Sequence, residues 1–157
     1  MHKVIIGAAA AAFLSATPAA PESMVVSPNG SRPTALGPAA NFVGQAIVDL
    51  YYAPNEQTPQ TGGHVTFSPG ARSAWHSYPA GQHLIVTSGR GWIHEEGGRK
   101  REIKPGDVIW TPPGVKHWHG GTDTTSMGHA TFTNMAGGKN TDWMEHVTDE
   151  QYKASAN

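Results

Sequence analysis

The chain contains 157 residues, including 19 glycines, 12 prolines, nine histidines and no cysteine, and its formal net charge is −1 at pH 7. A near-neutral charge without a basic stripe excludes a nucleic-acid partner, and the lack of cysteine excludes disulfides as a means of stabilising the fold. Hydrophobic residues make up 38% of the chain and charged residues 15%, which is typical of one globular domain, and the many Gly and Pro residues favour short strands joined by turns.

The N-terminal segment has the pattern of a signal peptide. Residues 4–14 form a nearly continuous apolar run after Lys3, and this run is shorter than the roughly 20 residues needed to cross a bilayer. Small residues follow as far as Ala20, as at a signal-peptidase site. We therefore expect residues 1–20 to be a signal peptide and the mature protein to be periplasmic or secreted, without stable membrane insertion. A buried N-terminal helix is the alternative.

The rest of the chain divides into an arm and a domain. Residues 21–40 are rich in Ser, Pro and Gly and predict a linker or N-terminal arm, whereas in residues 41–157 apolar alternations recur between turn signals. The predicted strands are residues 42–50, 64–68, 83–88, 91–96, 99–103, 108–111 and 127–133. Regular short strands with regular turns predict an all-β protein, an antiparallel sandwich or barrel.

One short helix is predicted near the C-terminus. Thr148 supplies an N-cap, and Asp149 and Glu150 supply an acidic first turn, for a helix that reaches Lys153. We expect this helix to close one end of the barrel.

Five residues on strands or their extensions are candidates for a common site. Side chains alternate along a strand, so His76 and Tyr78 share one face, and His117 and His119 share another. His129 lies on a third strand. Imidazoles from separate strands can meet inside a small barrel, and neutral imidazole is a common metal ligand, so the set predicts a metal site.

Two spaced patterns strengthen that prediction. They read Gly70-x5-His76-x-Tyr78-x3-Gln82-x6-Gly89 and Gly106-x5-Pro112-Pro113-Gly114-x2-His117. Both resemble the two motifs of the cupin superfamily, which implies a double-stranded β-barrel, or jelly roll, with a metal inside. The segments at residues 67–89, 116–120 and 142–152 sharpen the resemblance. They are similar to small single-domain cupins that include the bacterial manganese-dependent hydroxynitrile lyases, over residues 41–152.

The resemblance implies a set of metal ligands. Carried over by position, His76, Gln82 and His117 are ligands, and His119 and His129 lie beside the metal. The implied cofactor is manganese(II) or iron(II), with another divalent ion as an alternative, because mixed nitrogen and oxygen ligands suit these ions.

Tyr78 departs from the family pattern, since the relatives have a second histidine ligand there. Three alternatives follow. Tyr78 ligates the metal or hydrogen-bonds a metal-bound water; His119 or His83 supplies the missing ligand, although alternation aims His83 away; or metal affinity is lost and the barrel is only a binding pocket. Tyr78 is therefore both a candidate ligand and a candidate catalytic residue.

The implied function is a lyase acting on a small hydroxy or carbonyl compound, by cleavage of a cyanohydrin into aldehyde and cyanide. His119 or His129 is the candidate general base, because the reference pKa of imidazole is near 6.5. The alternatives are a carboxymuconolactone decarboxylase-like enzyme, an iron-dependent oxygenase and a non-catalytic cupin that binds a small ligand. For the last of these, four tryptophans offer stacking faces: Trp75, Trp92, Trp110 and Trp118.

The resemblance also implies self-association. Cupins commonly use an N-terminal strand to extend a partner's sheet, and residues 42–50 are the candidate for that strand. We expect a homodimer or homotetramer that acts on a small-molecule substrate.

Overall fold

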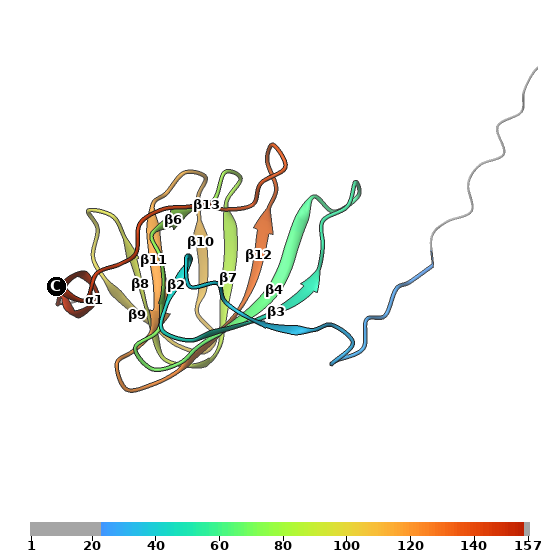
Figure 1. Cartoon of the computed structure of the whole chain (residues 1–157). Helices are drawn as coiled ribbons and strands as arrows, with labels where there is room; N and C mark the ends of the chain where they lie inside the picture. Colours follow the sequence, from blue (N-terminus) through green and yellow to red (C-terminus); the bar gives the residue numbers. More distant parts are fainter. Residues whose placement is uncertain (1–22, 156–157) are drawn as a thin grey trace, which may run out of the picture.

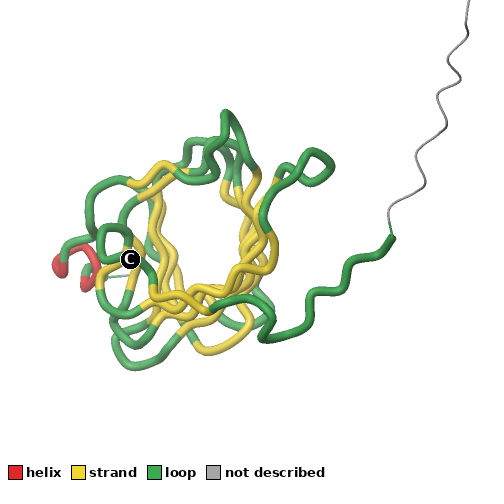
Figure 2. The backbone as a smooth tube through the Cα atoms, turned by 45° about the vertical axis from the view of Figure 1, so that its right-hand side comes forward, coloured by secondary structure: helices red, strands yellow, loops and turns green. Residues whose placement is uncertain are grey.

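Two curled antiparallel sheets enclose a barrel in the computed structural model, which describes residues 23–155 (Figure 1). Viewed along the barrel, the strands form a ring around its interior (Figure 2). The predicted signal peptide at residues 1–20 lies outside the described residues. No helix within residues 23–155 is long and apolar enough to span a membrane. The all-β fold is confirmed.

The first sheet has six strands in the order β1-β3-β4-β12-β7-β10. They are β1 (Thr34–Leu36), β3 (Ala46–Tyr52), β4 (Gln60–Phe67), β12 (Met127–Asn134), β7 (Gln82–Gly89) and β10 (Val108–Thr111). Strands β4, β12 and β7 are its longest, at eight residues each, and all their pairings are antiparallel. This sheet therefore provides one continuous wall of the barrel.

The second sheet has seven shorter strands, of which five follow the order β13-β6-β11-β5-β2. They are β13 (Asp142–Trp143), β6 (His76–Ser77), β11 (His117–Gly121), β5 (Arg72–Ser73) and β2 (Phe42–Val43). The hairpin of β8 (Gly91–Glu95) and β9 (Arg101–Ile103) joins through the pairing of β8 with β11. Strand β11 thus contacts three neighbours and anchors this wall.

The inner faces of the sheets form the main hydrophobic core. Its buried members are Phe42, Ala46, Phe67, Ala71, Leu84, Val86, Ile103 and Met127. They come from both sheets, and within β7 they alternate with exposed residues, as a half-buried strand requires. Burial of this apolar surface holds the two walls together.

The C-terminal helix α1 (Asp149–Lys153) has the predicted start, because Thr148 forms a capping box with Gln151. It does not close an end of the barrel. Its Tyr152 packs with Trp75, Trp118 and Val147 in a second cluster. Alternation along β11 puts Trp118 on the face opposite His117, so the helix covers the outer face of the second sheet.

The N-terminal part of the domain differs from the sequence-based expectation. Residues 42–50 do not form one strand, because Gly44, with φ of 75°, separates β2 from β3 and sends them to different sheets. Strand β3 pairs on both sides, with β4 and with β1 from the arm. The free edge at this end of the first sheet is therefore β1, and within residues 42–50 the edge strand is β2, at the end of the second sheet.

A buried arginine joins α1 to the barrel. Nε and Nη2 of Arg72 donate to the carbonyl oxygen of Val147 at 3.1 and 2.8 Å, and Nη2 also contacts the Asp149 carboxylate at 2.8 Å. The guanidinium lies over the ring of Tyr152, 4.8 Å from its centre.

Replacing this arginine tests its role in stability. Arg72→Met should lower the free energy of unfolding by about 3 kcal/mol, because it leaves the Val147 carbonyl without its donors. Asp149→Asn should have a smaller effect, since that carboxylate is exposed to solvent. Urea denaturation followed by circular dichroism measures both, and equal losses would contradict this assignment.

Candidate metal centre

Three histidines meet inside the barrel. One nitrogen atom from each of His76, His117 and His119 lies within 4.8 Å of the others, and all three side chains are buried. His76 in β6 is directly opposite His117 in β11, and His119 follows two residues later on the same face. The cross-strand register therefore creates the cluster.

Backbone hydrogen bonds fix two of the imidazoles. Nδ1 of His76 lies 2.9 Å from the carbonyl oxygen of Ala74, and Nδ1 of His117 lies 3.0 Å from that of Val115. A carbonyl oxygen only accepts, so each Nδ1 carries the hydrogen and donates it. The Nε2 of His117 then keeps a lone pair without a partner, as metal-binding histidines do, whereas the Nε2 lone pair of His76 accepts a hydrogen bond from Tyr78.

Six buried polar atoms in the described part of the chain have no hydrogen-bond partner. They are Oε1 of Gln82, Nε2 of His117, and both ring nitrogens of His119 and of His129. A buried polar atom without a partner costs about 1–3 kcal/mol, so six of them in one protein call for an explanation. A divalent cation bound by neutral imidazoles and a carboxamide oxygen would satisfy several of them, and the donor set fits manganese or iron.

Gln82, at the start of β7, presents its oxygen because its nitrogen is engaged. Nε2 donates to Oγ1 of Thr133 at 2.7 Å. The two residues lie opposite each other in the β7–β12 pairing. Thr133 therefore orients the amide, a role that the sequence alone did not reveal, because only the strand register brings the two residues together.

Tyr78 contacts the cluster through its hydroxyl group. Its Oη donates to Nε2 of His76 at 2.8 Å, and burial raises the pKa of the phenol, which keeps it protonated. His119 occupies the place of the third imidazole. The other residue expected to supply the missing ligand, His83, lies on the outer face of the barrel. Its ring packs against Trp110, with ring centres 4.6 Å apart.

His129 lies beside the three-histidine cluster, on β12. Its ring centre is 4.9 Å from that of His119, and its side chain has no exposed surface. Burial lowers the pKa of His129 to about 3, so the imidazole is neutral near pH 7 and keeps a lone pair that can accept a proton. The same desolvation lowers the pKa of His76 and His119.

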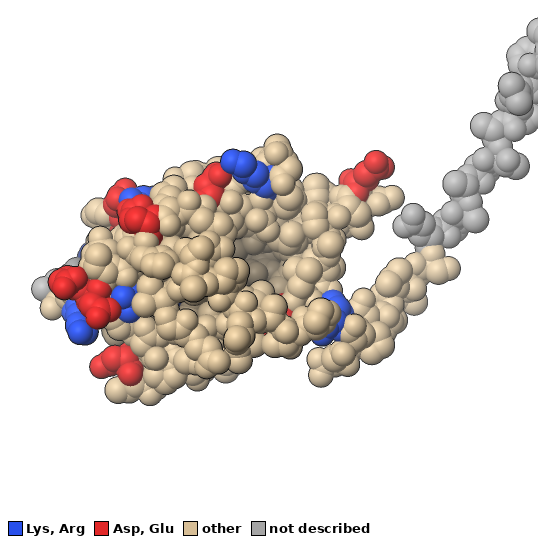
Figure 3. Space-filling model, viewed as in Figure 1, with Lys and Arg blue, Asp and Glu red and all other residues tan. Residues whose placement is uncertain are grey.

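A cavity of about 260 Å³ opens onto this group of residues. Five of the predicted site residues line this cavity: His76, Tyr78, Gln82, His119 and His129. No Asp, Glu, Lys or Arg of the described chain is among its lining residues. Figure 3 shows a hollow between the region of β2 and β13 and that of β3 and β4, and the surface around it carries few charges. The site therefore suits an uncharged molecule.

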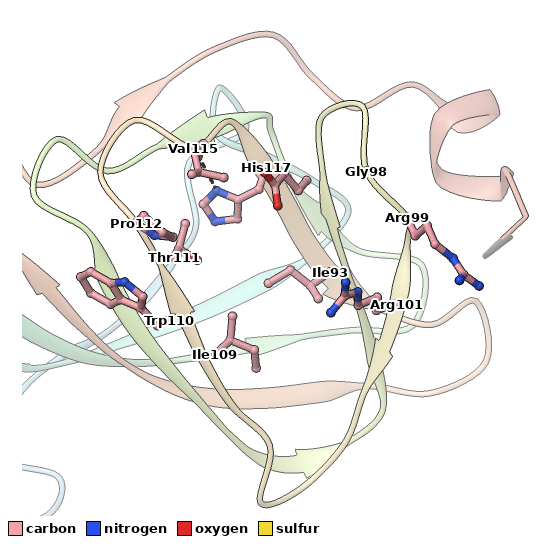
Figure 4. Close-up of a pocket in the computed structure, with 11 residues that line it drawn as sticks. Ile93, Gly98, Arg99, Arg101, Ile109, Trp110, Thr111, Pro112, Val115 and His117 are labelled. Carbon is pink, nitrogen blue, oxygen red and sulfur yellow. Dashed lines mark hydrogen bonds between the residues drawn. The ribbon is translucent and has the colours of Figure 1, made fainter.

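A second hollow, of about 230 Å³, lies on another side of His117 (Figure 4). It is lined by Ile93 and Arg101 from the β8–β9 hairpin and by Ile109 from β10, among others. Figure 4 also shows the hydrogen bond from His117 to Val115. None of the other clustered histidines reaches this hollow, so the chemistry is assigned to the larger cavity.

The tryptophans expected to offer stacking faces lie elsewhere. Trp75, Trp92 and Trp118 pack in the cluster beneath α1, and Trp110 packs against His83 and lines the second hollow, which His117 also lines. The tryptophan that lines the cavity is Trp143, in β13. Its sequence context gave no signal, because β13 has only two residues and no periodicity.

Comparisons with known proteins agree with this architecture. Residues 63–130 match the cupin domain. An (R)-mandelonitrile lyase from Granulicella tundricola is 51% identical over 124 residues, which cover 79% of this chain and 95% of that protein. A cupin-like protein from Thermotoga maritima superimposes with a TM-score of 0.73 at 34% identity, covering 81% and 96% of the two chains. A predicted oxalate decarboxylase from the same organism, at 16% identity and a TM-score of 0.63 over 71% and 100%, shares the fold.

The role of Thr133 can be tested by manganese binding. Thr133→Val removes the acceptor for Nε2 of Gln82 at nearly constant volume, so the amide loses its fixed orientation. The affinity for manganese should fall about tenfold, as measured by titration calorimetry. Thr131→Val, in the same cavity, is the matched control and should bind manganese like the wild type. Equal affinities in all three proteins would contradict the assignment.

The role of Tyr78 can be tested by elemental analysis. Tyr78→Phe removes the hydroxyl group but keeps the ring, and a protonated phenol is not needed to hold a cation. The variant should therefore retain the metal stoichiometry of the wild type. Loss of the metal from this variant alone would instead make Tyr78 a phenolate ligand.

Proposed function

The chain belongs to the cupin family, and on that basis we propose that it is a metal-dependent lyase that cleaves a small neutral cyanohydrin into an aldehyde and cyanide. The observation that carries the proposal is the set of unpartnered imidazole and carboxamide atoms at the uncharged cavity. The relative from Granulicella tundricola, named (R)-mandelonitrile lyase, supports this reaction class.

The proposed ligands are His76, His117 and His119 through nitrogen and Gln82 through Oε1. When bound, a manganese(II) or iron(II) ion supplies Lewis-acid chemistry, because it lowers the pKa of a hydroxyl group that it contacts. This set assigns His119 to the metal. The general base is then His129, the remaining neutral imidazole without a partner.

Proton movement in the proposed reaction uses the side chains of this chain. A ring nitrogen of His129 accepts the hydroxyl proton of the cyanohydrin as the carbon–oxygen bond becomes a carbonyl. The bond to the cyano carbon breaks, and its electron pair leaves with cyanide. His129 then returns the proton to give hydrogen cyanide. Tyr78, as a protonated phenol, donates its hydrogen bond to Nε2 of His76, and a cation bound at that nitrogen would release this hydroxyl group.

The cavity chemistry also bears on the other candidate functions. A decarboxylase would bind a substrate carboxylate, for which the proposed cation, and no Arg or Lys of the described lining residues, could supply the positive charge. An iron-dependent oxygenase would consume oxygen with iron and not with manganese. A non-catalytic binding protein would be isolated without metal and would gain stability from a ligand.

Two further proposals rest on the sequence. We propose export to the periplasm or the exterior from the pattern of residues 1–20, and a homodimer or homotetramer from the family resemblance. Fractionation of cells that produce the full chain, and light scattering of the mature protein, test them separately.

The central experiment measures metal content and cyanide release together. Protein purified without chelator and loaded with manganese should release cyanide from mandelonitrile, and removal of the metal should abolish the activity. His129→Ala should lower kcat by about 100-fold or more while metal content stays unchanged. His83→Ala, on the outer face, is the control and should keep full activity. A fully active His129→Ala protein would contradict the assignment of His129 as the base. Absence of cyanide release from the manganese-loaded wild type would contradict the lyase proposal.

A further inference from the structure

The outer part of the cavity contains an aromatic pair that the proposed mechanism does not use. Trp143 in β13 lies directly opposite His76 in β6, and their ring centres are 4.9 Å apart. The ring of Phe42 meets Trp143 edge-on, with centres 5.5 Å apart. Phe42 is buried, whereas Trp143 is 41% exposed although it lines the cavity. Part of the indole surface is therefore open to solvent beside the imidazole cluster.

The lining of the cavity combines polar and apolar side chains. The histidines, Gln82 and several threonine and asparagine side chains supply polar atoms to the lining, and aliphatic side chains line it together with the aromatic pair: Val48, Leu50 and Val65. A molecule that matches both kinds of side chain has one compact polar group and one apolar group. The binding energy of such a molecule comes mainly from apolar contact, and its orientation comes from the few polar atoms.

From this arrangement we propose that Trp143 and Phe42 form an aryl-binding subsite, which gives the enzyme its preference for substrates with an aromatic ring next to the reacting carbon. The substrate preference rests on the proposed lyase function, whereas the binding of an aromatic ring to this subsite does not. Aromatic rings attract one another in stacked or edge-on pairs with centres 4.5–7 Å apart. Since the indole already contacts His76, a ring packed against it has its first substituent carbon close to the imidazoles.

The position of Trp143 is fixed before a ligand arrives. The backbone N–H of Met144 donates to the carbonyl of Trp75, and the N–H of Trp75 donates to the carbonyl of Glu145, both at 2.9 Å. These bonds directly follow the indole-bearing residue, and with the pairing of β13 and β6 they hold β13 on the barrel. A preformed aromatic surface loses little conformational entropy on binding, which favours its use for recognition.

The test compares two cyanohydrins across matched variants. Trp143→Ala should lower kcat/KM for mandelonitrile, which has a phenyl ring, about tenfold more than for acetone cyanohydrin, which has only methyl groups. Trp143→Phe should keep most of the preference. Trp110→Ala is the matched control, because Trp110 is similarly exposed, at 45%, but is not among the residues that line the larger cavity. Metal content should be the same in all variants.

Binding of benzyl alcohol, which has no cyano group to lose, separates this inference from the lyase proposal. Calorimetry on manganese-loaded protein should show weaker binding in Trp143→Ala and unchanged binding in Trp110→Ala. If the wild type cleaves neither cyanohydrin but shows this binding pattern, the lyase proposal fails and the subsite stands. The subsite is overturned if the wild type does not bind benzyl alcohol, or if Trp143→Ala binds it like the wild type.

Discussion

Buried imidazoles whose nitrogens find no partner in the described chain are the constraint on which the candidate site depends. Desolvation keeps them neutral, and hydrogen bonds from Nδ1 of His76 and His117 to backbone carbonyls fix both rings with the lone pair on Nε2, which in His76 accepts from Tyr78. Such an arrangement is unfavourable for folding alone, since apolar side chains of similar volume would fill the space without unpaired polar atoms. A divalent cation bound by these atoms would offset that cost.

The barrel meets this constraint by means of strand register. His76 and His117 are cross-strand partners, and so are Gln82 and Thr133 in the opposite sheet. Both pairs are held by ladders of backbone hydrogen bonds, which position side chains more accurately than loops do. The hydrophobic core behind them keeps the two sheets at a fixed separation, so packing far from the site contributes to its geometry.

The cavity lining provides both reactive polar groups and an apolar binding surface. Its imidazoles and amide offer chemistry, while Trp143 and Phe42, next to His76, offer an apolar surface. The lack of formal charge among its described lining residues means that specificity comes from shape and from a few polar atoms. This combination suits a reaction in which a small neutral molecule has one polar carbon to be cleaved and one apolar group to be held.

The sequence by itself determined the all-β class, most strand positions, the helix cap at Thr148 and the shared face of His117 and His119, because alternation and turn chemistry are local properties. The place of Gln82 in the site came from the resemblance to cupins. Only the tertiary structure decided which pairs touch. It placed α1 on an outer face, divided residues 42–50 at Gly44, brought His119 into the ligand cluster and gave the cavity Trp143 in place of the four expected tryptophans. These outcomes depend on register between strands distant in the chain, which no local pattern specifies.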